Sequence, residues 1–315
     1  MSRTMESPSQ PQDLTMGRAR SAGLVSRRRF AYLASGAVLI ASLTTACANA
    51  DASGGAGKAL QASGSTTVAP VAADAAEALK AQGLNITVAT QGGSAGGISQ
   101  LGAGQIDIAL SSKPVSDQDK AASPKTDYVS TQLGADAVGV IITKQVADAG
   151  VKNLTVDQVK GLFEGKITNW KQVGGPDLAV FVYDKEPGRG TREVLDKYLY
   201  HGEKPPPPPN SGNFAIVGGN LETRNKLEST PGAVAPLSTG FVEGRDKLAV
   251  VTLDGIAPSM ENIAAGKYPM SRPLFMVTNG QPKGDAKKFI DYILSDKGQP
   301  LLTKHGYLTL KQIGK

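Results

Sequence analysis

The chain has 315 residues, of which 40% are hydrophobic and 20% are charged, as is usual for a globular protein with one large or two modest domains. The formal net charge is +6, but six of the 34 basic residues and two of the 28 acidic residues lie within residues 1–47. The rest of the chain therefore carries only about +2. A near-neutral net charge after residue 47 gives no support for nucleic-acid binding.

Residues 1–47 predict an export signal rather than a part of the fold. Residues 26–30, Ser-Arg-Arg-Arg-Phe, match the twin-arginine pattern, and an apolar run ends at Cys47, the only cysteine. That run is too short and too interrupted by Ser and Thr to predict a membrane span. Two interpretations stay open. In one, this is a lipoprotein signal and lipidated Cys47 anchors the protein to the membrane; in the other, it is a plain signal peptide with an incidental cysteine.

Residues 48–58 predict a flexible tether, after which strands and helices alternate. The predicted helices are 68–82, 97–103, 156–163 (capped by Thr155), 191–200, 285–295 and 298–305. The predicted strands are 85–90, 106–110, 137–142, 178–183, 232–237, 247–253 and 273–278. Five prolines at 205–209 predict extended polyproline II on the surface. The alternation predicts an α/β fold with helices packed on mostly parallel sheets.

Three short segments rich in glycine and hydroxyl residues each follow a predicted strand and lead into a helical pattern. They are Gly-Ser-Thr-Thr at 64–67, Gly-Ser-Ala-Gly-Gly at 93–97 and Gly-Arg-Gly-Thr at 188–191. Backbone N–H groups at such turns form anion sites, and ligands of α/β proteins bind beyond the carboxyl ends of strands. We therefore expect the three turns to converge on one anion. The candidate residues are Ser65, Thr66, Thr67, Ser94, Gly97, Ser111, Ser112 and Thr191. In the alternative interpretation, these Ser and Thr residues are only helix caps.

The chain offers few residues for catalysis or for metal binding. Only two histidines occur, His201 and His305, and no cysteine follows residue 47, so neither a zinc site nor a cofactor is predicted. Residues 92–96 fit the G-x-S-x-G nucleophile elbow, which makes Ser94 the candidate nucleophile of a serine hydrolase with one of the histidines as base. No HGGG-type oxyanion segment accompanies it. Hydroxyl turns suit reversible capture of an anion better, and the hydrolase stays an alternative.

In combination and order, several segments resemble the phosphate-binding proteins of bacterial phosphate ABC transporters, from about residue 61 to the C-terminus. They include Gly-Ser-Thr-Thr-Val-Ala-Pro at 64–70, Ile-Asp-Ile-Ala-Leu-Ser-Ser at 106–112, Glu-Pro-Gly-Arg-Gly-Thr-Arg-Glu at 186–193 and Tyr-Pro-Met-Ser-Arg-Pro-Leu at 268–274. The resemblance implies a two-lobed periplasmic-binding-protein fold of type II, whose lobes close on phosphate or a similar oxyanion. It also implies an ABC permease as partner, and we expect a monomer.

The resemblance also divides the chain and assigns site residues. Crossings near Lys144 and Arg245 would give lobe I, 59–143 plus 247–315, and lobe II, 144–246. Thr66 and Thr67 would donate hydrogen bonds to the anion from the first turn and Ser94 from the second, whereas Gly190 and Thr191 would donate from lobe II.

Three positions depart from the best-known form of the family. Ser112 stands where that form has an aspartate that accepts the phosphate proton, Lys185 where an arginine reaches the ligand, and Arg189 where a small serine lies inside the turn. Arg189 could contact the anion, pair with Glu186 or point to solvent. The changes make the site more cationic, so another oxyanion or a phosphorylated small molecule stays an alternative to phosphate.

Three further side chains invite two interpretations each. Trp170 could stack on a ligand, but a packing anchor is the better prediction. Lys113 could be a rim charge near the cleft or a solvated lysine, and Arg192 could face the ligand or an acidic partner. A sensory or adhesive role without a permease also stays open.

Overall fold

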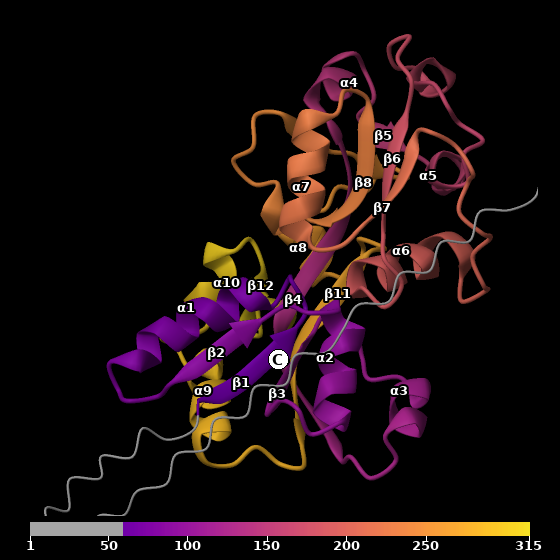
Figure 1. Cartoon of the computed structure of the whole chain (residues 1–315). Coiled ribbons are helices and arrows are strands. Elements are labelled where there is room, and N and C mark those ends of the chain that lie inside the picture. The colour runs from indigo at the N-terminus through magenta and orange to yellow at the C-terminus, as the bar shows by residue number, and fades with distance from the viewer. Residues whose placement is uncertain (1–58) are drawn as a thin grey trace, which may run out of the picture. The chain divides into compact units, whose positions relative to one another are not determined.

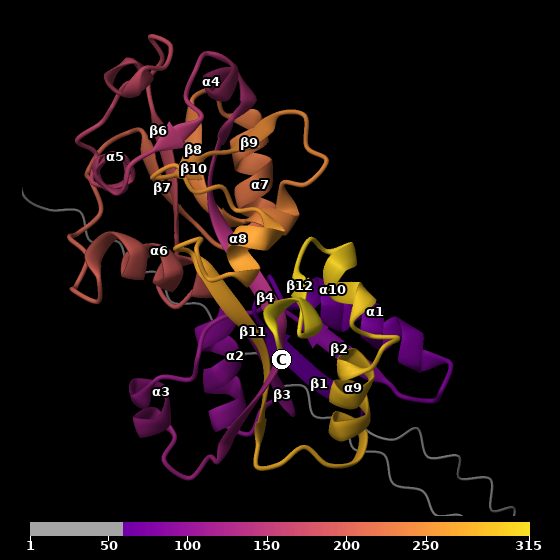
Figure 2. The same ribbon diagram turned by 180° about the vertical axis from the view of Figure 1, so that it is seen from behind.

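The computed structural model describes residues 59–315 (Figure 1); the predicted signal, the tether and Cys47 lie outside the described residues. Within 59–315, no helix is long and apolar enough to cross a membrane. The predicted α/β fold with two lobes agrees with the structure, in which the long strand β4 (Tyr128–Thr143) runs from one lobe into the other and β11 (Ser271–Asn279) pairs with its first part (Figures 1 and 2).

Lobe I contains the first three strands and the C-terminal helices. Its elements are β1 (Leu60–Gly64), α1 (Ala69–Lys80), β2 (Ile86–Ala89), α2 (Gly93–Gly102), β3 (Ile108–Ser111), α3 (Asp117–Ala122), α9 (Gly284–Leu294), α10 (Pro300–Lys304) and β12 (Leu308–Thr309). Lobe II contains the middle of the chain. Its elements are α4 (Lys144–Asp148), β5 (Asn153–Leu154), α5 (Val156–Phe163), β6 (Phe181–Lys185), α6 (Gly190–Tyr200), β7 (Phe214–Val217), α7 (Asn220–Ser229), β8 (Ala233–Ser238), β9 (Leu248–Val250), β10 (Thr252–Leu253) and α8 (Met260–Ala264).

One continuous path of strands, β2-β1-β3-β11-β4-β8-β6-β7, runs through both lobes. The strands are parallel at the two ends of this path, where β1 pairs with β2 and β3, and β6 pairs with β7 and β8. Around β4 and β11 the pairing is antiparallel. This antiparallel centre was not foreseen from the sequence. β4 leads from lobe I into lobe II, and β11 runs back through lobe I beside the first half of β4, so the two strands have opposite directions.

The contacts of β4 show where the chain changes lobe. Its residues up to Ala137 pair with β11, whereas Val138 onward pairs with β8 and then β9. Residues 248–253 pair with lobe II strands, and Tyr268 and Met270 pack into the lobe II core. The predicted second crossing near Arg245 is therefore wrong, because this segment continues lobe II as far as Met270. We propose lobe I as 59–137 plus 271–315, and lobe II as 138–270.

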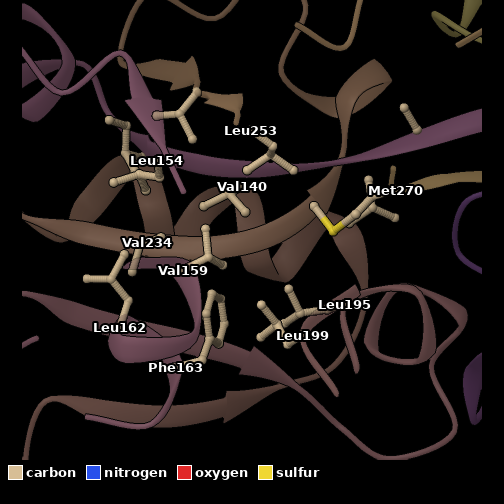
Figure 3. Close-up of a cluster of buried hydrophobic side chains, with 14 of the residues drawn as sticks. Val140, Leu154, Val159, Leu162, Phe163, Leu195, Leu199, Val234, Leu253 and Met270 are labelled. Carbon is tan, nitrogen blue, oxygen red and sulfur yellow. The ribbon is translucent and has the colours of Figure 1, made fainter. Parts of the chain in front are cut away.

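The core of lobe II holds the helix whose bounds the sequence predicted correctly, α5 (Val156–Phe163). Thr155 Oγ1 accepts the N–H of Gln158 at 3.2 Å, and Gln158 Oε1 accepts the N–H of Thr155 at 2.9 Å, which completes a capping box. The buried face of α5 packs in the same cluster as Leu195 and Leu199 of α6 (Figure 3). This packing fixes the helix that carries the third glycine turn.

The chain's single tryptophan anchors a loop of lobe II, as predicted. Trp170 is fully buried, and its Nε1–H donates to the carbonyl oxygen of Gly232 at 2.8 Å. Trp170→Phe should lower the free energy of unfolding by about 1–3 kcal/mol, because it removes this buried hydrogen bond and leaves the carbonyl with only the N–H of Phe181, at 3.1 Å, as donor. Urea unfolding followed by circular dichroism measures the change. An unfolding midpoint equal to that of the wild type would show that this hydrogen bond contributes nothing.

Two further predictions can be compared with the structure. The predicted helix 97–103 starts earlier, at Gly93, because Gly92 (φ 68°) and Gly93 (φ 61°) turn the chain through a left-handed conformation that glycine adopts without strain. The proline run 205–209 has no regular secondary structure, and its three central prolines are exposed. It lies on the surface as expected.

Candidate anion-binding site

Nine of the residues predicted to bind the ligand line one small cavity. They are Ser65, Thr66, Thr67, Ser94, Ser112, Lys185, Arg189, Gly190 and Thr191, and the lining also includes Gly93, Gly218 and Asn220. These residues lie at or just beyond the carboxyl ends of the strands β1, β3, β6 and β7, or at the N-termini of α2, α6 and α7. That is the edge at which α/β sheets bind ligands.

Two candidates from the sequence do not line this cavity. A Cβ at Gly97 would lie 2.5 Å from the carbonyl oxygen of Ser63, so this glycine lets α2 approach the end of β1 closely. Ser111 Oγ donates to the carbonyl oxygen of Lys113 at 2.7 Å. Both residues shape the walls instead, and the approach of α2 brings Ser94 to the cavity.

The lobe I wall is a network of buried hydroxyls without a charged group. Ser65 Oγ donates to Ser112 Oγ at 3.0 Å, and Ser94 Oγ lies 3.3 Å from the same oxygen. The backbone N–H of Ser112 donates to Ser94 Oγ at 3.1 Å, and that of Thr67 donates to Ser65 Oγ at 3.2 Å. Because a hydroxyl can rotate between donating and accepting, this wall can adapt to an anion in more than one protonation state.

The lobe II wall carries the positive charge. The Lys185 side chain is 1% exposed, and its Nζ donates to the carbonyl oxygens of Gly218 (3.2 Å) and Gly219 (3.3 Å) and also to Thr223 Oγ1. Burial, and next the nearby charge of Arg189, lower the pKa of Lys185 to about 7. A lysine with a pKa of about 7 is only partly protonated at neutral pH. An anion bound beside it would stabilise the protonated, charged form.

Arg189 both lines the cavity and pairs with a carboxylate. Its Nε and Nη2 donate to Glu186 Oε2 at 2.9 and 2.5 Å, and its side chain is 14% exposed. Of the three orientations left open by the sequence, the structure therefore shows the Glu186 pair, and it excludes a side chain that points into solvent. The pair neutralises part of the positive charge at the rim.

Arg272, which sequence reasoning did not assign to the site, joins the two lobes beneath the cavity. Its Nη2 donates to Thr67 Oγ1 at 2.9 Å in lobe I, and its Nη1 donates to Thr191 Oγ1 at 3.0 Å in lobe II. The Asp136 carboxylate holds the guanidinium at 2.7 and 3.0 Å and accepts from Ser238 Oγ at 2.8 Å. Burial raises the pKa of Asp136, and the attraction of Arg272 opposes that rise.

Asn220, also missed, belongs to a fourth turn of the same kind. Its Nδ2 donates to Thr67 Oγ1 at 2.9 Å, and its backbone N–H donates to Thr66 Oγ1 at 3.3 Å. The signal was present in the sequence: an apolar stretch, 214–217, is followed by Gly-Gly-Asn and a helix. Four helix N-termini, not three, therefore surround the cavity.

The remaining charged candidates have protein partners. Lys113 pairs with Asp119 and Glu193, so it is not a solvated lysine. Arg192 pairs with Asp184 and Asp196, an acidic partnership that the sequence left open. Burial raises the pKa of Asp184 to about 6 against the attraction of Arg192.

Neither histidine lies in the cavity with Ser94. His201 ends α6 with an exposed side chain, and His305 Nε2 lies 2.9 Å from Asp74 Oδ2. Ser94 Oγ has hydroxyl and N–H neighbours from Ser112 instead, which does not favour the hydrolase interpretation. Among residues 59–315, no cluster of three or more His, Cys, Asp or Glu could hold a metal ion.

A two-lobed α/β fold with a polar cavity between its lobes is typical of substrate-binding proteins. Residues 49–297 match the family described as the PBP superfamily domain. The phosphate-binding protein PstS of Bacillus subtilis (strain 168) is 31% identical over 266 residues, which cover 82% of this chain and 84% of the relative. The chain therefore belongs to the PstS-like phosphate-binding proteins of the PBP superfamily.

Solved structures agree with this family. A putative phosphate ABC transporter substrate-binding protein with bound phosphate from Clostridium perfringens is 29% identical, with a TM-score of 0.71 over 80% of this chain and 99% of the other. An ABC-type phosphate transport receptor from Vibrio cholerae is 26% identical, with a TM-score of 0.63 over 79% and 99% of the two chains.

Proposed function

We propose that this protein captures inorganic phosphate between its two lobes and delivers it to an ABC permease. One observation carries the proposal: hydroxyls and helix N-termini from both lobes, together with Lys185 and Arg189, converge on one small cavity. Helix N-termini and neutral donors stabilise a tetrahedral anion while adding little net charge, so the anion can be released again. Membership of the PstS-like family and the phosphate in the Clostridium perfringens structure support this ligand.

We also propose that the protein is exported and held at the membrane by lipidated Cys47. The support is the twin-arginine pattern, the apolar run and the position of the cysteine in residues 1–47, which lie outside the described residues. A tether at 48–58 would then let the two lobes move near a permease. PstS-like substrate-binding proteins are extracytoplasmic, in agreement with export.

Calorimetry tests the proposed ligand directly. The purified protein should bind inorganic phosphate with one site per chain, and Ser94→Ala should weaken that binding about 5- to 20-fold, as expected for one lost hydrogen bond to a charged group. Ser99→Ala is the matched control, because Ser99 is exposed on the same helix α2. Absence of phosphate binding by the wild type at millimolar concentration would overturn the proposal.

A second oxyanion is the alternative that this site itself raises. At the position where the family's best-known form has an aspartate, Ser112 presents a hydroxyl, and hydroxyls form the rest of the lobe I wall. A hydroxyl does not repel a fully ionised anion. Titrations with sulfate and glycerol phosphate, beside phosphate, decide between the ligands, and ester turnover that disappears in Ser94→Ala would support a hydrolase instead.

Lys185 should give phosphate binding a particular pH dependence. Its pKa is about 7 without the anion, so it is largely neutral above pH 7, and a bound anion favours its charged form. Binding above pH 7 should therefore take up a proton at Lys185, and the affinity should fall as the pH rises from 7 toward the pKa of the bound state. Arginine stays charged throughout, so Lys185→Arg should remove this contribution.

Calorimetry at pH 8 in two buffers of different ionisation enthalpy measures the protons taken up on binding. The wild type should take up more protons than Lys185→Arg, by as much as about one per phosphate. The comparison between the two proteins cancels the titration of phosphate itself. Equal proton uptake would show that binding does not change the charge of Lys185, which would contradict this prediction.

A further inference from the structure

Lys113 is a buried lysine held by carboxylates of both lobes. Its side chain is only 7% exposed, and its Nζ lies 3.1 Å from Asp119 Oδ2 in lobe I and 3.0 Å from Glu193 Oε1 on α6 in lobe II. Asp119 is fixed in its own lobe, because it also accepts the N–H and the hydroxyl of Ser116 in the capping box of α3. Glu193 is 44% exposed and comes from the other lobe.

The Lys113–Glu193 pair stands beside the anion cavity without lining it. Lys113 follows Ser112 directly, and Glu193 is three residues beyond Gly190 in the first turn of α6. Ser112 and Gly190, which both line the cavity, touch each other across the lobes: a Cβ at Gly190 would lie 2.5 Å from Ser112 Oγ. The ion pair therefore spans the lobes next to this close contact.

The charge of Lys113 depends on these partners. Burial by itself lowers the pKa of Lys113, but Glu193 and then Asp119 outweigh it, and the pKa is raised above its usual value. Separation of the lobes would leave Lys113 with Asp119 and remove Glu193. The interaction with Glu193 thus contributes free energy only while the lobes are together.

We propose that the Lys113–Glu193 pair is a latch that holds the lobes closed and so sets the affinity for the anion without touching it. The proposal rests on the proposed function, in which the lobes close on a bound anion. A pair that favours the closed state raises the population able to hold the ligand, and affinity rises by the same factor. Both residues are positioning residues, and their effect should be the same for every anion that the closed state holds.

The test is calorimetry with phosphate and with arsenate, a tetrahedral oxyanion of the same charge, on the wild type and Glu193→Gln. We expect Glu193→Gln to raise the Kd about 5- to 20-fold for both anions, within the usual range for coupling between a conformational equilibrium and binding. Asp157→Asn is the matched control: Asp157 lies in the first turn of α5, also in lobe II. This control removes the same favourable charge at a helix N-terminus without breaking a contact between lobes.

Thermal unfolding without anion separates a latch from a structural role. Glu193→Gln and Asp157→Asn should have similar Tm values without phosphate, and only Glu193→Gln should gain less Tm from added phosphate than the wild type does. Glu193→Asp keeps the charge but shortens the side chain. It should also weaken binding, which provides a second variant if Glu193→Gln folds poorly.

The outcomes distinguish this proposal from the function on which it rests. A wild type that binds no phosphate overturns the proposed function. A wild type that binds phosphate while Glu193→Gln and Glu193→Asp bind it equally well overturns the latch alone. A loss for phosphate but not for arsenate also overturns the latch, because Glu193 would then act on the ligand.

Discussion

Gly190→Ala should weaken phosphate binding about 10- to 100-fold while leaving the ligand-free protein at least as stable as the wild type. The added Cβ would lie 2.5 Å from Ser112 Oγ and 2.9 Å from the Ser112 carbonyl oxygen, and the backbone atom cannot rotate away. Overpacking of this kind costs about 1–3 kcal/mol. The overlap arises only when α6 of lobe II meets lobe I, so it opposes closure specifically.

In the open, ligand-free protein, Gly190→Ala should increase the stability rather than decrease it. Gly190 begins α6, and its φ is not in the left-handed region, so alanine fits the helix and is favoured over glycine by as much as about 1 kcal/mol. Gly212→Ala is the matched control, because a Cβ there meets nothing within 4 Å. Calorimetry gives the affinity, and thermal unfolding without phosphate gives the stability.

Two results would contradict this prediction. Full affinity in Gly190→Ala would show that the contact with Ser112 is not part of the phosphate-bound state. A marked fall in Tm without phosphate would show that the contact also holds the ligand-free protein together. Reduced affinity, with a ligand-free stability at least equal to that of the wild type, would show that closure of the lobes requires glycine at position 190. A larger residue there would meet Ser112 before the lobes are fully closed.

Arg272→Met should be the most destabilising single substitution in the site, lowering the free energy of unfolding by about 3–5 kcal/mol. The Asp136 carboxylate is fully buried, and Arg272 is its only cationic partner in the described part of the chain. Removal of one member of a buried ion pair leaves the other charge uncompensated. Thr67 and Thr191 also lose the donor that joins them, so phosphate binding should fall strongly.

A double variant tests this explanation. Asp136→Asn in the Arg272→Met background removes the unpaired charge, and it should restore part of the lost stability, whereas independent effects would simply add. The deficit of Arg272→Met should also shrink as the pH falls, because Asp136 without its arginine can take up a proton. Urea unfolding at two pH values measures both effects, and a double variant less stable than Arg272→Met would contradict the role of the buried charge.

Local patterns predicted the parts of the site that are local in the chain. A glycine and hydroxyl turn between a strand and a helix is visible within a few residues, and all three such turns in the prediction line the cavity. The fourth, ending at Asn220, shows the same pattern but follows a strand that was not recognised. This turn was not predicted because the strand before it, residues 214–217, was not recognised, although the residue pattern of the turn is present in the sequence.

Arg272 could not be predicted from its neighbours in the sequence. It lies between two prolines in strand context, and its role follows from pairing with Asp136 and Thr67, which are 136 and 205 residues distant. The boundary of the lobes was missed for a related reason. β4 has 16 residues, and only its apolar second half, 137–142, stands out as a strand. Long-range pairing, not local propensity, defines both features.

The antiparallel insertion of β11 has a consequence for how this chain reaches its native state. β11 pairs with β3 on one side and β4 on the other, so the sheet of lobe I has a gap until residues 271–279 are available. A nascent chain ending before Ser271 would expose two unpaired strand edges, which are prone to aggregate. Such late, distant pairing slows folding. The site should therefore form last, in one cooperative step that needs nearly the whole chain.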